Sequence, residues 1–206
     1  MLFEDTYRTI AKASEGDFRD RSSKFLAFAY PVGLETELKD NLIQLKSLHP
    51  KANHHCWALR LTIDRTVFRI SDDGEPAGTT GSPMLNTLLS RDLTNIALVV
   101  VRYFGGTLLG VPGLINAYKC ATEDVLKNAL IVEKTVNDVY TVEFGYPQIN
   151  DVMRIIKEES LHIMSQKLDN KCNIQLSVRK MPANKILLKL DKLTGIQIKY
   201  NFTIQT

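Results

Sequence analysis

The stretches SDDGEPAGTTGSP (Ser71 to Pro83) and VVVRYFGGTLLGVPGLINAY (Val99 to Tyr118) decide the fold of this 206-residue chain. The first places three acidic residues in a glycine-rich turn, and the second ends an apolar run in an arginine and another glycine cluster. Seven of the 11 glycines lie between Gly74 and Gly113. Glycine is costly unless the backbone needs a positive φ or another group must approach it closely. We therefore interpret the rest of the chain as scaffold for this region or as an appendage to it.

The overall composition is typical of a soluble globular protein, with 44% hydrophobic and 24% charged residues. No apolar run approaches the roughly 18 residues of a membrane span, and the N-terminus lacks the basic-then-apolar order of a secretory signal. The cysteines, Cys56, Cys120 and Cys172, are far apart, as is usual for free thiols in a reducing compartment. We expect a cytoplasmic protein without contact to a membrane.

The excess positive charge is confined to the last third of the chain. Residues 1–137 contain 16 basic and 16 acidic residues, whereas residues 138–206 contain 10 basic and 7 acidic residues. This asymmetry predicts two modules with different partners, with a boundary near Asn137.

The first module is expected to mix strands and helices. Leucines recur three or four residues apart from Leu34 to Leu48, which predicts an amphipathic helix that His49-Pro50 ends. The polar segment 14–23 is expected to be a loop. Strands are predicted at residues 6–10, 24–30, 55–62, 66–70 and 96–104, the last of them buried on both faces.

Turn and helix signals connect these strands. Asp64-Arg65 predicts a tight turn that makes a hairpin of strands 55–62 and 66–70. Ser82-Pro83 predicts an N-cap and a first helical residue, and Pro112 is expected to open a helix that runs to about Leu130.

The last third predicts a small domain with the element order β-α-β-β-α-β. Its strands are expected at residues 139–144, 162–168, 172–179 and 196–204, and its helices at 147–159 and 182–193. This order is that of the ferredoxin-like split βαβ unit.

Asp72, Asp73 and Glu75 are the catalytic candidates by residue type. Carboxylates in one turn can hold Mg²⁺ through water, or one of them can serve as a general base. The alternative is structural, with the acids capping backbone amides or pairing with Arg102. The spacing does not match an EF-hand loop.

The second glycine cluster also has two interpretations. Gly105-Gly106, with the helix that Pro112 opens, can cradle an anion on bare amides, or it can be a tight strand-to-helix connection. It lacks both the P-loop and the dinucleotide-binding fingerprints. The spacing of its residues favours the connection.

Two further groups are weaker candidates. His54, His55 and Cys56 suggest zinc, but neighbouring strand residues point to opposite faces, so a buried cysteine at a strand start is the simpler explanation. We expect neither a metal nor a cofactor. Basic residues near the C-terminus can contact nucleic acid, although a solvated helix face is the commoner explanation. They are Lys180, Lys185, Lys189, Lys192 and Lys199.

These motifs together closely resemble the signature of the IMPACT-like family, which includes the bacterial YigZ proteins and the eukaryotic IMPACT translational regulators. SDDGEPAGTTGSP, VVVRYFGG and GLINAY carry the resemblance, and HHCWAL (His54 to Leu59) and Ser23-Lys24-Phe25 add to it. The match covers about residues 20–125. The β-α-β-β-α-β tail resembles the small domain that bacterial members append, which is akin to the last domain of elongation factor G.

The resemblance implies an α+β fold. Residues 1–137 would form an α/β sandwich like the second domain of ribosomal protein S5, and residues 138–206 a ferredoxin-like domain. It also implies a role near translation or RNA, without an accepted catalytic assignment. The family's motif residues map onto Asp72, Asp73, Gly74, Glu75, Arg102, Tyr103, Gly105, Gly106 and Gly113.

This chain departs from the family pattern after Gly110. Members commonly continue Gly-Thr-Gly-Gly-Leu and a basic residue before Ala-Tyr, whereas this chain has Val111-Pro112-Gly113-Leu114 and Asn116. The loss of a glycine at this helix start removes access to the backbone amides. The loss of the basic residue removes a charge that could pair with a phosphate.

We expect a non-enzymatic, translation-associated protein that binds RNA or a ribosome-associated factor. One alternative is an enzyme that acts on a small phosphorylated or acidic metabolite between the acidic loop and Arg102–Gly106. There Asp73 or Glu75 would be the base. A second alternative is an adaptor between proteins.

Overall fold

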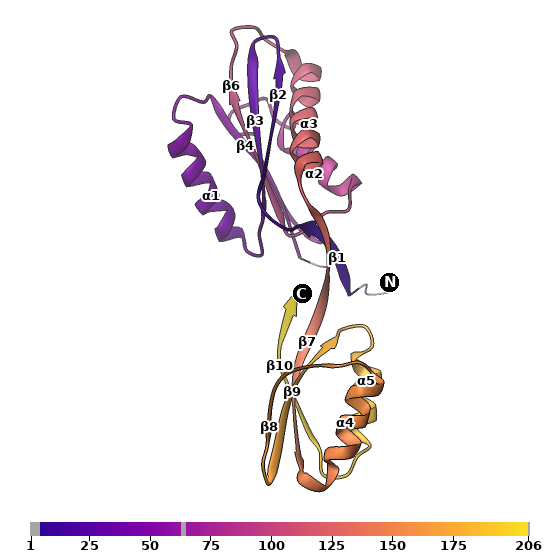
Figure 1. Ribbon diagram of the computed structural model, residues 1–206. Helices are drawn as coiled ribbons and strands as arrows, with labels where there is room; N and C mark the ends of the chain where they lie inside the picture. Colours follow the sequence, from indigo (N-terminus) through magenta and orange to yellow (C-terminus); the bar gives the residue numbers. More distant parts are fainter. Residues whose placement is uncertain (1–4, 63–64, 206) are drawn as a thin grey trace. The chain divides into compact units, whose positions relative to one another are not determined.

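The computed structural model describes residues 5–62 and 65–205, and within them it shows a mixed α/β fold with two five-stranded sheets and five α-helices (Figure 1). The chain divides into two compact units. One holds residues 7–133, and the other holds residues 134–205 together with residues 5 and 6.

The sheet of the first unit is antiparallel throughout. Its strands follow the order β2 (Ser14–Asp20), β3 (Ser23–Pro31), β6 (Ile96–Tyr103), β4 (His54–Leu61) and β5 (Val67–Ser71). The β4–β5 hairpin is confirmed. Its predicted turn at Asp64-Arg65 lies partly outside the described residues.

The loop expected at residues 14–23 was wrong, because Ser14–Asp20 is an edge strand. The side of β2 that faces α3 (Gly110–Asn128) holds Ser14, Gly16, Phe18 and Asp20, so Phe18 is the one apolar side chain on it. A Cβ on Gly16 would stand 2.6 Å from the amide nitrogen of Val125. Helix and strand approach closely at Gly16, so most of this side is small or polar and the sequence shows no apolar alternation.

Helices cover both faces of this sheet. α1 (Glu35–Leu48) lies on one face, and α2 (Gly81–Ser90) lies with α3 on the other (Figure 1). Alternate residues of β6 enter the two cores: Ile96, Leu98 and Val100 on the α2–α3 side, and Ala97, Val99 and Val101 on the α1 side. The expectation of a strand buried on both faces is confirmed.

The predicted helices exist, but their ends and faces differ in detail. Leu38 and Leu45 of α1 are buried, whereas Leu34 and Leu48 are 64% and 63% exposed. The buried side of this helix therefore includes fewer leucines than their spacing in the sequence predicted.

The starts of α2 and α3 were predicted too late. α2 begins at Gly81 with Thr80 as its N-cap, and α3 begins at Gly110, two residues before Pro112. Proline is tolerated throughout the first turn of a helix, where its missing N–H has no intrahelical partner to lose. It therefore marks the start of a helix only approximately.

The second unit has the predicted element order. It runs β7 (Ile131–Gly145), a short 3-10 helix (Tyr146–Gln148), α4 (Ile149–Glu158), β8 (His162–Leu168), β9 (Lys171–Arg179), α5 (Ala183–Asp191) and β10 (Gln197–Gln205). Strand β7 starts earlier than predicted, because its first residues lack clear alternation.

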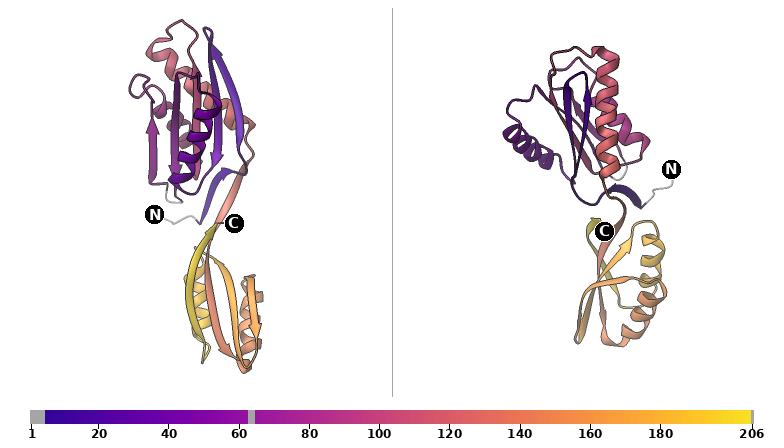
Figure 2. Two further views of the ribbon diagram at one scale, coloured as in Figure 1. Left: turned by 90° about the vertical axis from the view of Figure 1, so that its left-hand side faces the viewer. Right: turned by 45° about the horizontal axis from the view of Figure 1, so that its top comes forward.

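The sheet of the second unit has the strand order β10-β7-β9-β8 with antiparallel pairs, and β1 (Thr6–Ile10) also joins it. α4 and α5 pack on one face, over a core that includes Val142, Ile174 and Leu176 (Figure 2). Asp5 is 3% exposed and receives two hydrogen bonds from Arg179, of 3.1 and 2.8 Å. Within the described residues, no helix has both the length and the apolarity required to cross a membrane.

Candidate functional site

The loop between β5 and α2 folds around Asp72. Its carboxylate accepts hydrogen bonds from the amides of Gly78 (2.7 Å), Thr80 (3.1 Å) and Gly81 (2.9 Å), and from the Thr80 hydroxyl (2.6 Å). Burial raises the pKa of Asp72, but the hydrogen bonds from Thr80, Gly78 and Gly81 outweigh it and leave the pKa below its usual value. Asp72 therefore acts as a cap for the start of α2.

Two left-handed residues turn Glu75 inward from the same loop. Asp73 has φ 42° and Gly74 has φ 87°, and the Glu75 amide donates to the Asp72 carbonyl at 2.9 Å. The Glu75 side chain is 4% exposed. Its Oε1 accepts from Nη1 of Arg102 at 2.6 Å and from the hydroxyl of Tyr118 at 2.9 Å. The acid is consequently engaged with groups of the same chain.

Arg102 reaches Glu75 from the middle of the sheet. The register of β6 sets Arg102 opposite Phe25 on β3 and His54 on β4. Its guanidinium lies 5.4 Å from the ring centroids of both Phe25 and Phe104, and its side chain is 5% exposed. Ring faces and a carboxylate thus compensate a charge that would be costly to bury alone.

Tyr118 and Cys56 extend this buried cluster. The Cys56 sulfur lies 3.2 Å from the Tyr118 hydroxyl and 3.0 Å from the Asp72 carbonyl. Burial raises the pKa of Cys56 to about 12 and raises the pKa of Tyr118 as well. Both groups stay protonated at neutral pH, so the cluster offers neither a thiolate nor a phenolate.

Asp73 is the exposed member of the three acids. Its Oδ2 accepts from the His55 amide at 2.6 Å, and its carbonyl lies 2.8 Å from Nδ1 of His54. A carbonyl only accepts, so Nδ1 carries a proton, and Nε2 of His54 lies 3.9 Å from Oε1 of Glu75. Asp73 thereby ties the loop to the first residues of β4.

The two neighbouring histidines serve different faces of the sheet. His55 lies on the α1 side, where burial lowers its pKa, while His54 lies beside Glu75. Within residues 5–62 and 65–205, no three His, Cys, Asp or Glu side chains gather in a way that could hold a metal ion.

Gly105 is required for a close backbone approach. A Cβ there would stand 2.1 Å from the carbonyl carbon of Ser22. The Gly105 amide donates to the Ser23 hydroxyl at 3.1 Å, and the Phe104 amide donates to Asn53 at 2.8 Å. These amides serve a tight connection within the chain.

The structure brings only part of the motif together. Asp72, Asp73, Glu75 and Arg102 meet around one cluster. Tyr103 points to the other face of the sheet, where its hydroxyl lies 2.9 Å from Nδ1 of His49. Gly106, with φ 85°, belongs to the connection after β6, and Gly113 lies inside α3.

Sequence reasoning missed the roles of Tyr118, Cys56 and Thr80 in this cluster. A signal for Tyr118 was present, because it lies among the small and apolar residues of the buried side of α3. A tyrosine in such a position needs a partner for its hydroxyl.

The predicted lysine group has mixed surroundings. Lys180, Lys185 and Lys192 are exposed. Lys189 forms an ion pair with Glu159 on α4, and that hydrogen bond raises the pKa of Lys189.

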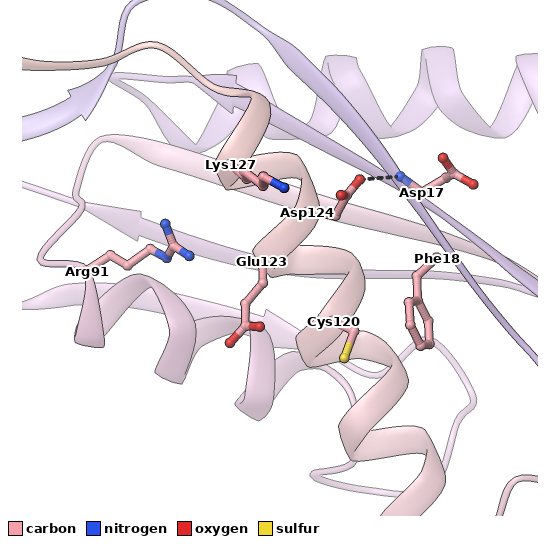
Figure 3. Close-up of a pocket in the computed structure, with 7 residues that line it drawn as sticks. All are labelled: Asp17, Phe18, Arg91, Cys120, Glu123, Asp124 and Lys127. Atoms are coloured by element: carbon pink, nitrogen blue, oxygen red, sulfur yellow. Dashed lines mark hydrogen bonds between the residues drawn. The ribbon is translucent and has the colours of Figure 1, made fainter.

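Two shallow grooves flank α3 in the first unit. One, of about 380 Å³, is shown in Figure 3. It contains Arg91, the half-buried Cys120 and the 3.0 Å bond from the Asp17 amide to Asp124. The other, of about 490 Å³, lies between α2 and α3. The lining of neither groove includes Asp72, Glu75 or Arg102.

Comparison with known proteins matches residues 21–126 to the Impact N-terminal domain. An IMPACT family member of Haemophilus influenzae is 34% identical over 161 residues, which cover 77% of this chain and 78% of that protein. YigZ of Escherichia coli is 36% identical over 139 residues, or 66% of this chain and 68% of its own.

A solved structure described as a hypothetical protein covers 95% of this chain and 97% of its own, with a TM-score of 0.69 and 26% identity. The Saccharomyces cerevisiae protein IMPACT homolog is 37% identical over 113 residues, which cover 52% of this chain and 43% of that protein.

Proposed function

Because this chain belongs to the IMPACT family, we propose that it is a non-enzymatic, translation-associated regulatory protein of the YigZ type. The relatives include bacterial and eukaryotic IMPACT proteins. The proposed role places the protein in the cytoplasm, where its cysteines, Cys56, Cys120 and Cys172, remain free thiols.

The observation that carries the non-enzymatic part is the burial of Glu75 with Arg102. An enzyme acting at the acidic loop needs an accessible base and an unpaired cation for an acidic substrate. Here the carboxylate of Glu75 and the guanidinium of Arg102 neutralise each other, and their side chains are only 4% and 5% exposed. Asp72 is likewise occupied by α2. These contacts support a loop-holding role for the motif, of which Asp73, Gly74 and Gly106 are exposed.

We further propose that the second unit contacts RNA, and that its exposed Lys180, Lys185 and Lys192 supply the phosphate contacts. The charge excess of residues 138–206 supports this assignment. Lys189 contributes less, because Glu159 already pairs with it.

The finer fold assignment is also a proposal. We assign residues 1–137 to an S5 domain-2-like sandwich and residues 138–206 to a ferredoxin-like domain. The antiparallel order β10-β7-β9-β8 supports the second assignment, because split βαβ units insert one strand between the two that a helix connects.

The test is titration of the full chain with ribosomes and with a structured RNA at two salt concentrations. We expect binding at low salt that weakens as salt rises, and a smaller salt dependence in the double variant Lys185→Glu/Lys192→Glu. The matched control is Lys39→Glu/Lys46→Glu, which reverses two exposed charges on α1. Absence of binding at low salt, or equal losses in both double variants, would contradict the RNA assignment.

A further inference from the structure

We propose that the edge strand β5, beside the neighbouring helix α2, forms a binding surface for an extended, acidic segment of a partner protein, which adds to the sheet as a sixth strand. β5 is the last strand of the order β2-β3-β6-β4-β5. An edge strand offers backbone groups that an extended peptide can pair with. This inference does not depend on the proposed role in translation.

The backbone of β5 presents alternate residues outward. The Phe68 carbonyl accepts a hydrogen bond from the guanidinium of Arg69, at 2.9 Å, so this carbonyl points away from β4. In an antiparallel pair, consecutive residues direct their backbone groups to opposite sides of the strand. Phe68 and Ile70 therefore offer the outward N–H and C=O groups. In the absence of a partner, the guanidinium of Arg69 occupies the carbonyl of Phe68.

The same two residues expose apolar side chains. Phe68 is 52% exposed and Ile70 is 38% exposed, which is unusual for an edge strand because natural edges are commonly protected by charge or proline. Their register opposite Arg60 and Ala58 of β4 places them on the face that α2 covers. A peptide at this edge would shield both side chains.

Helix α2 borders this surface. A Cβ on Gly81 would stand 2.8 Å from Cβ of Ile70, so α2 begins directly beside the end of β5. Gly81, Leu85 and Leu89 are four residues apart and share one side of the helix. Leu89 is 46% exposed and continues this ridge. At the opposite end, Arg65 lies 2.9 Å from Asp92, just beyond α2, which shows that strand and helix run side by side in opposite directions.

Charge selects an acidic occupant. Arg65 and Arg69 lie at the Phe68 end of this edge. Among the described residues, Asp92 contacts Arg65 (2.9 Å) and the buried Arg60 (3.9 Å). Arg69 is exposed and presents its cation to an occupant of the edge. The chemistry thus fits an extended segment with apolar side chains at every second position and Asp or Glu at one flank.

The experiment selects a random decapeptide phage library against the immobilised full chain. We expect the enriched peptides to alternate apolar residues and to carry flanking acids. A synthetic copy of the best peptide should slow hydrogen exchange of the Phe68 and Ile70 amides at least tenfold. The variant Phe68→Pro removes the outward N–H and should lose most binding, while Phe202→Ser, which changes a similarly exposed aromatic residue of β10 (46%), should bind normally.

Arg69→Glu tests the charge without altering the backbone. It should weaken the acidic peptide at least fivefold and should favour a copy whose flanking acids are replaced by lysine. Thermal unfolding of each variant separates loss of binding from loss of fold. Three results would overturn the proposal: no enrichment, binding that Phe68→Pro and Arg69→Glu leave intact, or a structured RNA that binds through Arg69 while no peptide is selected.

Discussion

The Arg102 guanidinium donates a 2.6 Å hydrogen bond to Glu75, and both side chains are almost completely buried. The two residues are 27 positions apart in the chain, and their pairing fastens the acidic loop to the central strand of the first unit. A buried ion pair contributes little net stability compared with apolar residues, but loss of one partner leaves the other charge buried and uncompensated. This asymmetry gives the first prediction.

Arg102→Met should lower the free energy of unfolding by about 3–5 kcal/mol, because Glu75 is left buried without its cation. The double variant Glu75→Gln/Arg102→Met should recover more than half of that loss. Urea denaturation at pH 7 measures both. Lys119→Met, which breaks an exposed pair with Glu123, is the control and should change stability by about 0.5 kcal/mol or less. Additive losses in the double variant would argue against a mutually neutralising pair.

Asp72→Asn should reduce stability at neutral pH, and the reduction should vanish in acid. The folded-state pKa of Asp72 lies below its ordinary value of 3.8, so the carboxylate stabilises the fold above that pH. Its contribution is lost as the pH falls through the folded pKa. Urea midpoints of wild type and variant between pH 7 and pH 2.5 should converge at the acid end. A constant difference across this range would exclude a stabilising role for the charge.

Gly105→Ala should destabilise the first unit by about 1–3 kcal/mol or more, because the new methyl group meets the backbone of Ser22 and Ser23. Gly33→Ala is the matched control. A Cβ at Gly33 meets no atom within 4 Å, so we expect a change of less than about 1 kcal/mol. Thermal unfolding compares the two, and equal shifts would show that the close approach at Gly105 is not tight.

Thiol labelling should distinguish the three cysteines. Cys120 is partly exposed, whereas Cys56 and Cys172 are buried, and the pKa of Cys56 is raised to about 12. A disulfide reagent at pH 8 should modify Cys120 first in the native protein, and the other two only after denaturation. Cys120→Ser should abolish the first phase. Rapid native labelling of Cys56 would mean that the cluster around Tyr118 opens readily.

Local patterns predicted much of the fold. The leucine spacing gave α1, and the apolar β-branched run gave β6 with its burial on both faces. The element order of the last third was predicted because most of its helices and strands have a clear hydrophobic period of their own. The sequence did not predict edge strand β2, since Phe18 is the one apolar side chain among those that it directs toward α3, and a single such residue makes no apolar alternation.

The candidate site was predictable only in its parts. Asp72, Glu75 and Arg102 were recognised as potential partners, yet the sequence left open whether they line a cleft or pair internally. Tyr118 and Cys56, which complete the cluster, lie on a helix and a strand far from the acidic loop in the chain. No local period indicates that such residues meet.

The sequence by itself determined where the chain turns and which segments are helix or strand, because these depend on neighbouring residues and on their hydrophobic period. Only the tertiary structure decided which group each acidic side chain of the loop contacts. Asp72 caps α2, Asp73 binds the start of β4 and Glu75 neutralises Arg102. These roles follow from the antiparallel register that places β4 and β6 beneath the loop. The partner of each charged side chain depends on distances of a few ångströms between elements that are remote in the chain.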